Sequence, residues 1–375
     1  MTVNIRHILH AAWLRLTLCV ATLAVLCVLV SCSDDTDDDG SRTVVLRFST
    51  AQATGVTRGA TASTAKDDAV KDLTVLIFDS KDNVIGSKYE SYDYTRTDIS
   101  VSIQTRVAQG CKVYAFANVG TIIGPNFFHG LSTRSEIDNK VYTMKVDGEL
   151  DTQPCLLMKG ELDDFNTDDT SVKTIELQRL ASKFNINITA QNDATDGSWP
   201  ITIDKYQLCK IPRTTTLSKL TDQPVPSASD YYNGSETEVK ITSAANSPVT
   251  EKIVTYMYGN NVGKNDKATD WTKRNFQNQP KTTGVSTFLH IWAHTAVWKS
   301  EYYVYLGGNT LTADGTSPDY TDYTIYPNYH YTVNITIKGS GHAENGARVT
   351  YQAIPYFSVA SINAWGTAQT TPIDM

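Results

Sequence analysis

The alternation of apolar and polar residues along this chain predicts β-strands. Val44, Leu46 and Phe48 alternate with Val45, Arg47 and Ser49, which is typical of a half-buried strand. Residues 72–90 predict a hairpin, because an alternating apolar run leads into the turn-forming residues 79–83 and a second apolar run follows. The first part of the chain therefore carries the pattern of a β-sheet protein.

The same pattern continues through the rest of the chain. Residues 111–120 predict a strand with one apolar face, made of Cys111, Val113, Ala115, Ala117 and Val119. Further short predicted strands lie at 151–162, 184–188, 237–243, 251–259, 286–298, 301–308 and 328–341. No stretch sustains an amphipathic helical period over three turns. We therefore predict an all-β fold of two β-sandwich domains, with the boundary near Gln178.

Composition agrees with this fold class and removes one class of function. The chain has 375 residues, enough to build two ordinary cores. It contains 20 tyrosines and only 5 methionines, and a chain rich in Tyr, Thr, Val and Ile favours strands. The formal net charge is −7, so the chain has no electrostatic support for binding nucleic acid.

The first residues indicate export. Arg6 and Arg15 precede an uncharged run over residues 16–30, which is shorter than the roughly 20 residues of a membrane-spanning helix but suits a signal peptide. Ser31 and Cys32 follow, and a small residue before a cysteine at this place resembles the bacterial lipobox. We expect residues 1–31 to be a lipoprotein signal peptide, cleaved between Ser31 and Cys32, with a lipid on Cys32. The alternative is an ordinary signal peptide with an incidental cysteine.

The acidic stretch after Cys32 has two interpretations. Asp35, Asp37, Asp39 and Gly40 fit the opening of a calcium-binding EF-hand loop. Such a loop needs a bidentate acid at its twelfth position and flanking helices, but the twelfth residue is Leu46 and a predicted strand follows. The stretch is instead expected to be a solvated tether over residues 32–42.

Three cysteines remain after the predicted processing. Cys111, Cys155 and Cys209 are an odd number, so at most one intramolecular disulfide can form. The sequence leaves open whether Cys111 and Cys155 are bridged or are buried thiols. Packing must therefore supply most of the stability.

The chain carries no catalytic signature. It has no nucleophile elbow, P-loop or H-E-x-x-H motif, so we predict neither an enzyme nor a cofactor. His290 and His294 have the spacing of a helical zinc pair, but on a strand they lie roughly 13 Å apart, too far for one ion. We expect an aromatic packing surface that Phe288, Trp292 and Trp298 share with them.

A second acidic segment also falls short of a metal site. Residues 163–171 contain Asp163, Asp164, Asp168 and Asp169, which could hold a metal loosely. A solvated acidic surface loop is the simpler interpretation of such a charge run. We predict no metal site in this chain.

An ordered set of segments resembles a known family. The lipobox with its acidic leader is followed by "VTRGAT", "DLTVLIFDSKDNVI", "KVYAFANVG", "IELQRLASKFNINITA" and "YTIYPNYHYTVNITIKGSG". Together these are similar to the Bacteroidales fimbrillins, the FimA-like and Mfa-like subunits of type V pili. The resemblance runs through nearly the whole chain, and it implies two transthyretin-like β-sandwich domains in tandem, at 43–178 and 179–375.

The resemblance also implies a maturation route. Fimbrillin precursors are exported as outer-membrane lipoproteins that face the cell surface, anchored here by a palmitate-bearing Cys32. An arginine-specific protease then removes the leader and first strand, and a strand from another subunit fills the opened groove. Mature subunits build adhesive fimbriae by this donor-strand exchange. The partners implied are other fimbrial subunits, the protease, the membrane and a host or bacterial surface ligand.

The parts of this route map onto particular residues. Arg58 and Gly59 lie in a loop of small residues after the first strand, where a protease has access. The displaced strand carries Val44, Leu46 and Phe48. The candidate donor strand lies near 355–375, where Phe357, Val359, Ile362 and Trp365 are candidates to fill the groove.

Alternatives remain at each step. Arg42, Arg47 or Arg96 could be the cleaved arginine, and the C-terminal segment could be the last strand of its own domain. A different functional class is a surface glycan-binding outer-membrane lipoprotein that does not polymerise. The aromatic residues of 290–298 and 300–308 motivate it, because rings can stack on sugars.

Overall fold

The fold comes from a computed structural model of the full chain. The residues it describes are 40–49, 65–96, 98–192, 199–220, 223–243, 247–270, 273–281, 285–308, 319–339 and 348–354. The chain divides into two compact units, Met1–Arg42 and Thr43–Met375. The architecture below concerns the second unit. Among the described residues, no helix is both long and apolar enough to cross a membrane.

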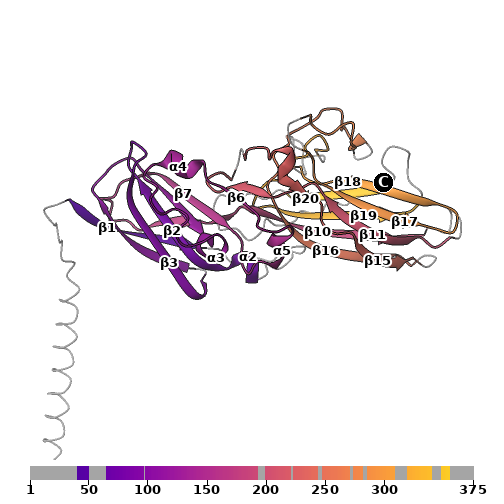
Figure 1. Ribbon diagram of the computed structural model, residues 1–375, viewed down its shortest axis with the longest axis horizontal. Coiled ribbons are helices and arrows are strands. Elements are labelled where there is room, and N and C mark those ends of the chain that lie inside the picture. Colours follow the sequence, from indigo (N-terminus) through magenta and orange to yellow (C-terminus); the bar gives the residue numbers. More distant parts are fainter. Residues whose placement is uncertain are drawn as a thin grey trace, which may run out of the picture. The chain divides into compact units, whose positions relative to one another are not determined.

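Two sheets form the N-terminal part of this unit (Figure 1). One sheet has the strand order β3-β2-β5-β7-β9 and the other has the order β4-β1-β8. The strands of the five-stranded sheet are β2 (Val70–Phe78), β3 (Val84–Arg96), β5 (Cys111–Ala117), β7 (Met158–Phe165) and β9 (Gln178–Arg179). The three-stranded sheet consists of β1 (Ser41–Ser49), β4 (Asp98–Arg106) and β8 (Lys173–Glu176).

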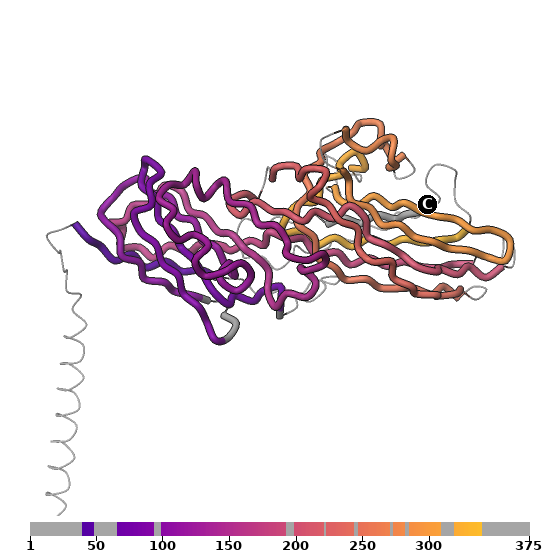
Figure 2. Tube along the Cα trace, viewed as in Figure 1, coloured from indigo at the N-terminus to yellow at the C-terminus, as the bar shows by residue number. Residues whose placement is uncertain are grey.

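Two four-stranded sheets follow, and Figure 2 traces their strands in magenta to yellow. Their strand orders are β16-β10-β19-β20 and β15-β11-β17-β18. The first contains β10 (Ala181–Ala190), β16 (Val249–Tyr258), β19 (His330–Ile337) and β20 (Arg348–Ile354). The second contains β11 (Thr202–Cys209), β15 (Thr237–Thr242), β17 (Phe288–His294) and β18 (Lys299–Tyr305). The all-β prediction is confirmed, and the tandem two-domain boundary near Gln178 stays a prediction.

Short elements complete the described fold. The small strand pairs are β12-β14 and β13-β6, built from β6 (Val141–Thr143), β12 (Ile211–Pro212), β13 (Thr214–Thr216) and β14 (Tyr231–Tyr232). The helices are α2 (Ala65–Asp68), α3 (Val119–Ile122), α4 (Arg134–Asp138), α5 (Glu149–Thr152) and η1 (Ala228–Asp230). None reaches two turns, as expected from the missing helical period.

Apolar side chains form two main cores. The first core joins both N-terminal sheets through β1, β2, β4, β5 and β8, and β2 contributes Val75 and Ile77. The second core fills the space between the four-stranded sheets and extends to the other face of β2, where it includes Leu76 and Phe78. Because both faces of β2 are buried, its last four residues, 75–78, form a continuous apolar run.

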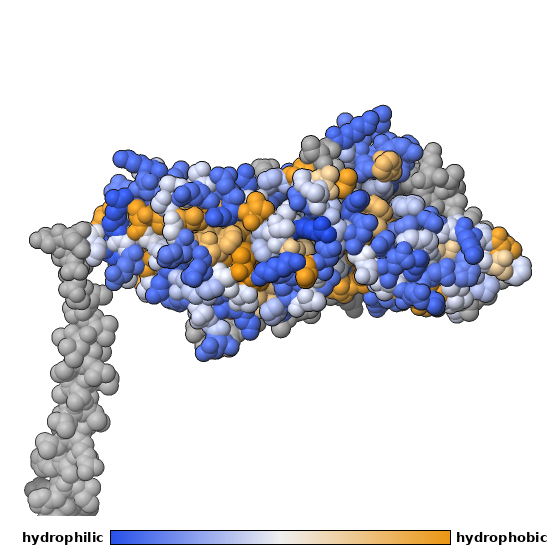
Figure 3. Space-filling model, in the orientation of Figure 1, coloured by the Kyte–Doolittle hydropathy of each residue, from blue (hydrophilic) through white to orange (hydrophobic). Residues whose placement is uncertain are grey.

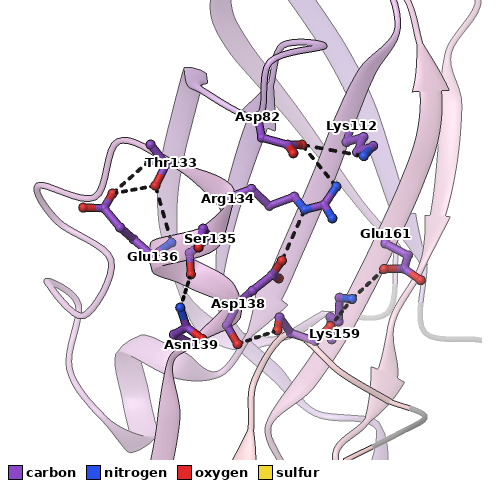
Figure 4. A network of polar contacts seen from close by, with 11 residues as sticks. Asp82, Lys112, Thr133, Arg134, Ser135, Glu136, Asp138, Asn139, Lys159 and Glu161 are labelled. Carbon is purple, nitrogen blue, oxygen red and sulfur yellow. Dashed lines mark hydrogen bonds and ion pairs between the residues drawn. The ribbon is translucent and has the colours of Figure 1, made fainter.

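Helix α4 fixes the turn between β2 and β3 (Figure 4). Thr133 and Glu136 form a capping box, in which the Thr133 backbone N–H donates to Glu136 at 2.9 Å. Arg134 then reaches Asp82 in the turn at 3.1 Å and Asp138 one helical turn later at 3.2 Å. The antiparallel pairing of β2 with β3 confirms the hairpin predicted for 72–90. Arg134 of α4 stabilises its turn.

Three sequence predictions need correction. Val119 does not extend the β5 face: Asn118 has a φ of 69° and ends the strand, so Val119 opens α3 and joins the second core. Residues 163–165 belong to β7 rather than to an acidic loop, because β7 continues to Phe165, which pairs with Cys111. Trp298 does not share a strand face with Phe288 and Trp292, because β17 ends at His294. Trp298 packs against the second core instead.

A glycine determines how closely β7 approaches β8. A Cβ added at Gly160 would lie 2.5 Å from the Glu176 backbone oxygen and 2.7 Å from Ile175 Cγ2. Only a residue without a side chain permits this contact. The position matters because β8 is the parallel neighbour of β1.

We expect Gly160→Ala to lower the free energy of unfolding by about 2 kcal/mol, because the added methyl group must push β8 away. Urea denaturation of the variant measures this loss. Gly339→Ala is the matched control, since a Cβ there meets nothing within 4 Å. Equal stability of the two variants would contradict the close packing of β7 on β8.

Candidate functional site: strand β1 and its surroundings

Strand β1 lies inside a sheet rather than at its edge. It is placed between β4 and β8 and runs parallel to β8, with Leu46 opposite Lys173 and Phe48 opposite Ile175. A strand in this position forms backbone hydrogen bonds with a neighbour on each side. Its loss would therefore expose the edges of both β4 and β8.

The predicted apolar face of β1 is buried in the first core. The exposed fractions of Val44, Leu46 and Phe48 are 5%, 0% and 0%. Between them, Val45 is 40% exposed and Arg47 is exposed, so the half-buried pattern read from the sequence is confirmed. Burying the three inward side chains contributes roughly 2 kcal/mol each, a large part of the 5–15 kcal/mol that typically stabilises a domain. The N-terminal sandwich thus depends on having a strand with this pattern in this place.

Most of the other predicted site residues lie outside the described residues. These are Ser31 and Cys32 of the lipobox, Arg58 and Gly59 of the processing loop, and the tail residues Phe357, Val359, Ile362 and Trp365. Their roles stay predictions. The alternative arginines are within strands, since Arg42 and Arg47 belong to β1 and Arg96 ends β3. Strand pairing holds the backbone away from a protease, which favours a loop arginine over these three.

A buried charge network begins a few residues after Arg58 and Gly59 in the sequence. Helix α2 begins at Ala65, and its Asp67 side chain has an exposed fraction of 0%. Lys183 Nζ on β10 donates to one Asp67 carboxylate oxygen at 2.8 Å, and the Tyr256 hydroxyl on β16 donates to the other at 2.6 Å. Asp67 thereby joins α2 to two strands of a C-terminal sheet.

Arg179 forms the second half of this network. Its guanidinium is buried, donates to the Asp67 backbone oxygen at 2.7 Å and pairs with the Asp68 carboxylate. It also donates to Asn328 at 3.2 Å. Burial lowers the pKa of Arg179, and the charges of Asp68 and Asp67 oppose that shift. Arg179 on β9 and Lys183 on β10 together hold α2 in place.

The sequence interpretation missed this network. Arg179 and Lys183 stand in the apolar stretch "LQRLASKFNI", and a cation within such a stretch is the available signal that a buried acid faces it. The sequence does not say which acid. Only the tertiary structure brings Asp67 and Asp68 into contact with these two cations, which lie more than a hundred residues further along the chain.

The two histidines of β17 do not form one site. Both lie on the same face of the strand, but His290 pairs with Glu301 at 2.9 Å and His294 pairs with Asp204 at 2.8 Å. Within the described ranges, no group of three His, Cys, Asp or Glu side chains is placed to hold a metal ion. The acidic residue Asp169 pairs with Lys173 at 2.7 Å.

The three retained cysteines are separate, buried free thiols. Burial raises the pKa of Cys155 to about 12 and that of Cys209 to about 11, which keeps both protonated. Cys111 is buried in the first core and its pKa is also raised. The open question of a Cys111–Cys155 bridge is therefore decided in favour of buried thiols.

A family model matches the first part of the described fold. Residues 43–204 match the family model described as "Major fimbrial subunit protein (FimA)". The resemblance to the fimbrillins is confirmed. Residues 255–335 match a domain of unknown function, DUF4906. No curated protein matches the chain.

Solved fimbrillin structures share the fold. A fimbrilin (FimA) from Porphyromonas gingivalis has a TM-score of 0.57 at 12% identity, and the match covers 88% of this chain and 99% of that one. The tip fimbrial protein Mfa3 of the same organism has a TM-score of 0.53 at 13% identity, covering 83% and 98%. A protein assigned to cell adhesion in Parabacteroides distasonis has a TM-score of 0.57 at 13% identity, covering 88% and 99%. At these identities the likeness establishes the fold.

We expect Lys183→Met to lower the free energy of unfolding by about 3 kcal/mol, because it leaves the Asp67 carboxylate buried without its ammonium partner. Chemical denaturation measures the loss, and the double variant Asp67→Asn with Lys183→Met should recover part of it. The control is Lys240→Met in the exposed Lys240–Glu238 pair, which should leave stability unchanged. A Lys183→Met variant as stable as the control would contradict the role given to this pair.

His330 on β19 makes stability depend on pH. Burial lowers the pKa of His330 from 6.5 to about 4, and the nearby Lys183 charge acts in the same direction. Between these values the unfolded chain binds a proton that the folded chain does not, so stability falls as the pH decreases from 7.5 to 4. We expect this residue to account for about 3 kcal/mol of that fall. In denaturation curves at several pH values, His330→Gln should show a smaller decrease than the natural chain, and equal decreases would contradict the assignment.

Proposed function

We propose that this chain is a structural subunit of a cell-surface fimbria, exported as a lipoprotein and assembled by donor-strand exchange. The match of residues 43–204 to the FimA family supports a fimbrial, adhesion-type role. The observation that carries the finer proposal is the place of β1: an internal strand whose buried face precedes the segment that contains Arg58. Removing that strand exposes two strand edges and an apolar slot, and an added strand repairs both.

In this proposal the lipid on Cys32 holds the precursor at the outer membrane, facing the cell surface. An arginine-specific protease then cuts between Arg58 and Gly59. β1 leaves with the N-terminal piece, while the Asp67 and Asp68 contacts keep α2 in place. The new N-terminus is therefore only a few residues from a fixed helix.

The occupant of the vacated slot comes from another subunit. It needs apolar side chains at alternate positions to replace Val44, Leu46 and Phe48. The C-terminal segment 355–375 is the candidate donor, with Phe357, Val359, Ile362 and Trp365 as candidate inserting residues. In this proposal the two α2 carboxylates and the exchanged strand have structural roles and no catalytic role.

Treating the purified full-length precursor with an arginine-specific protease tests the proposal. We expect a new N-terminus at Gly59 and a ladder of oligomers that resist SDS without boiling. Arg58→Ala should abolish both, whereas Arg47→Ala, in the paired strand β1, should change neither. A chain cut cleanly at Arg58 that stays monomeric would contradict polymerisation and favour the glycan-binding alternative.

A second variant separates cleavage from exchange. A chain that ends at Ile354 keeps the whole of β20 but lacks the candidate donor. We expect it to be cut at the same place and to remain monomeric. A ladder as long as that of the full chain would show that the donor strand lies elsewhere.

A further inference from the structure

Asp67 and Lys183 meet in the interior of the protein, away from water. Hydrophilic residues cover most of the surface drawn in Figure 3, where water surrounds their charges. The exposed fractions of the Asp67 and Lys183 side chains are instead 0% and 2%, and Lys183 Nζ lies 2.8 Å from an Asp67 carboxylate oxygen. An amine and a carboxyl group held together in a dry place are the two reactants of an amide bond.

The surroundings of this pair suit such a reaction. One proton transfer across the hydrogen bond gives a neutral amine and a neutral carboxylic acid, and burial makes this transfer cheaper than in water because neither charge is hydrated. The Lys66 ammonium lies over the same Tyr256 ring as Lys183, at 4.4 Å and 5.8 Å from the ring centroid. Burial lowers the pKa of Lys66, and the Lys183 charge adds to that shift. Loss of the Lys183 charge therefore relieves a repulsion.

Tyr256 supplies a donor to the oxygen on which negative charge would develop. Its hydroxyl is buried and donates to the second Asp67 carboxylate oxygen at 2.6 Å. When an amine adds to a carboxyl carbon, the remaining oxygen becomes an oxyanion, and a fixed donor stabilises it. A nitrogen in hydrogen-bond contact with one carboxylate oxygen is also close to the roughly 3–3.5 Å from which it can attack the carbon.

We propose that Asp67 and Lys183 form an intramolecular isopeptide bond after the chain has folded. One proton passes from Lys183 Nζ to Asp67 Oδ2, and the nitrogen lone pair then bonds to Cγ. The Cγ–Oδ2 bond breaks, and Oδ2 leaves as water with that proton and a second one from Nζ. One ammonium and one carboxylate thus give one amide and one water, without an oxidant, a reductant or an activating group. Fixed contact replaces activation, since such intramolecular reactions reach effective molarities of about 10⁵–10⁸ M.

Two other ion pairs of the described chain lack this combination. Asp68 faces Arg179, whose guanidinium stays protonated and has no free amine to attack with. Lys159 is nearly as buried as Lys183, but its partner Glu161 is 51% exposed, so water hydrates that carboxylate and keeps it charged. We therefore expect no amide at either of these pairs.

The bond would join α2 to β10 covalently. It would close a loop from residue 67 to residue 183, which stabilises a fold mainly by restricting the unfolded chain. Helix α2 would then stay connected to β10 even in a chain unfolded by denaturant or by force. The inference goes beyond the proposed function and does not depend on it.

The test is peptide mapping of the folded, uncleaved full-length chain by mass spectrometry after digestion with trypsin. Trypsin cannot cut after a lysine whose amine is acylated. We therefore expect peptide 67–71 joined to peptide 180–205, at their summed mass less one water molecule. Fragmentation of this product should place the link between the side chains of Asp67 and Lys183.

Three variants separate the bond from the ion pair. Lys183→Arg keeps the positive charge but should abolish the linked peptide. Tyr256→Phe removes the donor to Asp67 and should lower the yield of the linked peptide at least tenfold in chains harvested soon after synthesis. Lys159→Arg is the matched control at another buried lysine and should leave the yield unchanged.

Recovery of 67–71 and 180–183 as separate peptides from the natural chain, with no linked product, overturns the inference. A link that fragmentation places on Asp68 also overturns it, and so does a Tyr256→Phe variant that forms the bond as fast as the natural chain. Circular dichroism checks that the variants are folded, and the map of the natural chain decides even where a variant is not. Because this chain is uncleaved, the outcome is independent of processing and polymerisation.

Discussion

The N-terminal sandwich depends on the burial of one face of β1 in the first core. Val44, Leu46 and Phe48 fill space that β4, β8 and the facing sheet leave open, and the strand also completes the hydrogen bonding of both neighbours. This constraint has two consequences. The sheet cannot lose the strand without a replacement of the same pattern, and any replacement must enter as a strand rather than as a loop or helix.

The charge network holds α2 independently of β1. Asp67 and Asp68 are tied to Arg179, Lys183 and Tyr256, all outside the three-stranded sheet that holds β1. The described chain is therefore held by different interactions on the two sides of residues 50–64: apolar burial before them and buried ion pairs after them. Buried pairs contribute little net stability but are costly to break singly, so they fix position more than they add free energy.

The sheet β15-β11-β17-β18 packs differently on its two faces. The inward residues of β17 and β18 complete the second core, whereas the outward rings of His290, Trp292 and Tyr303 pack on one another. The period of two along a strand makes this division automatic.

The sequence by itself determined the strands whose pattern is local: the face of β1, the hairpin of β2 and β3, and the position of β17. Alternation indicates which side chains of a strand are buried, so these features could be predicted without knowing which strands lie beside them. Only the tertiary structure decided that β1 lies between β4 and β8, that Asp67 meets Lys183, and that the cysteines are apart. It also placed Val119 in a helix, because the positive φ of Asn118 ends β5. Pairing across a hundred residues depends on how whole sheets pack, and no local pattern carries that information.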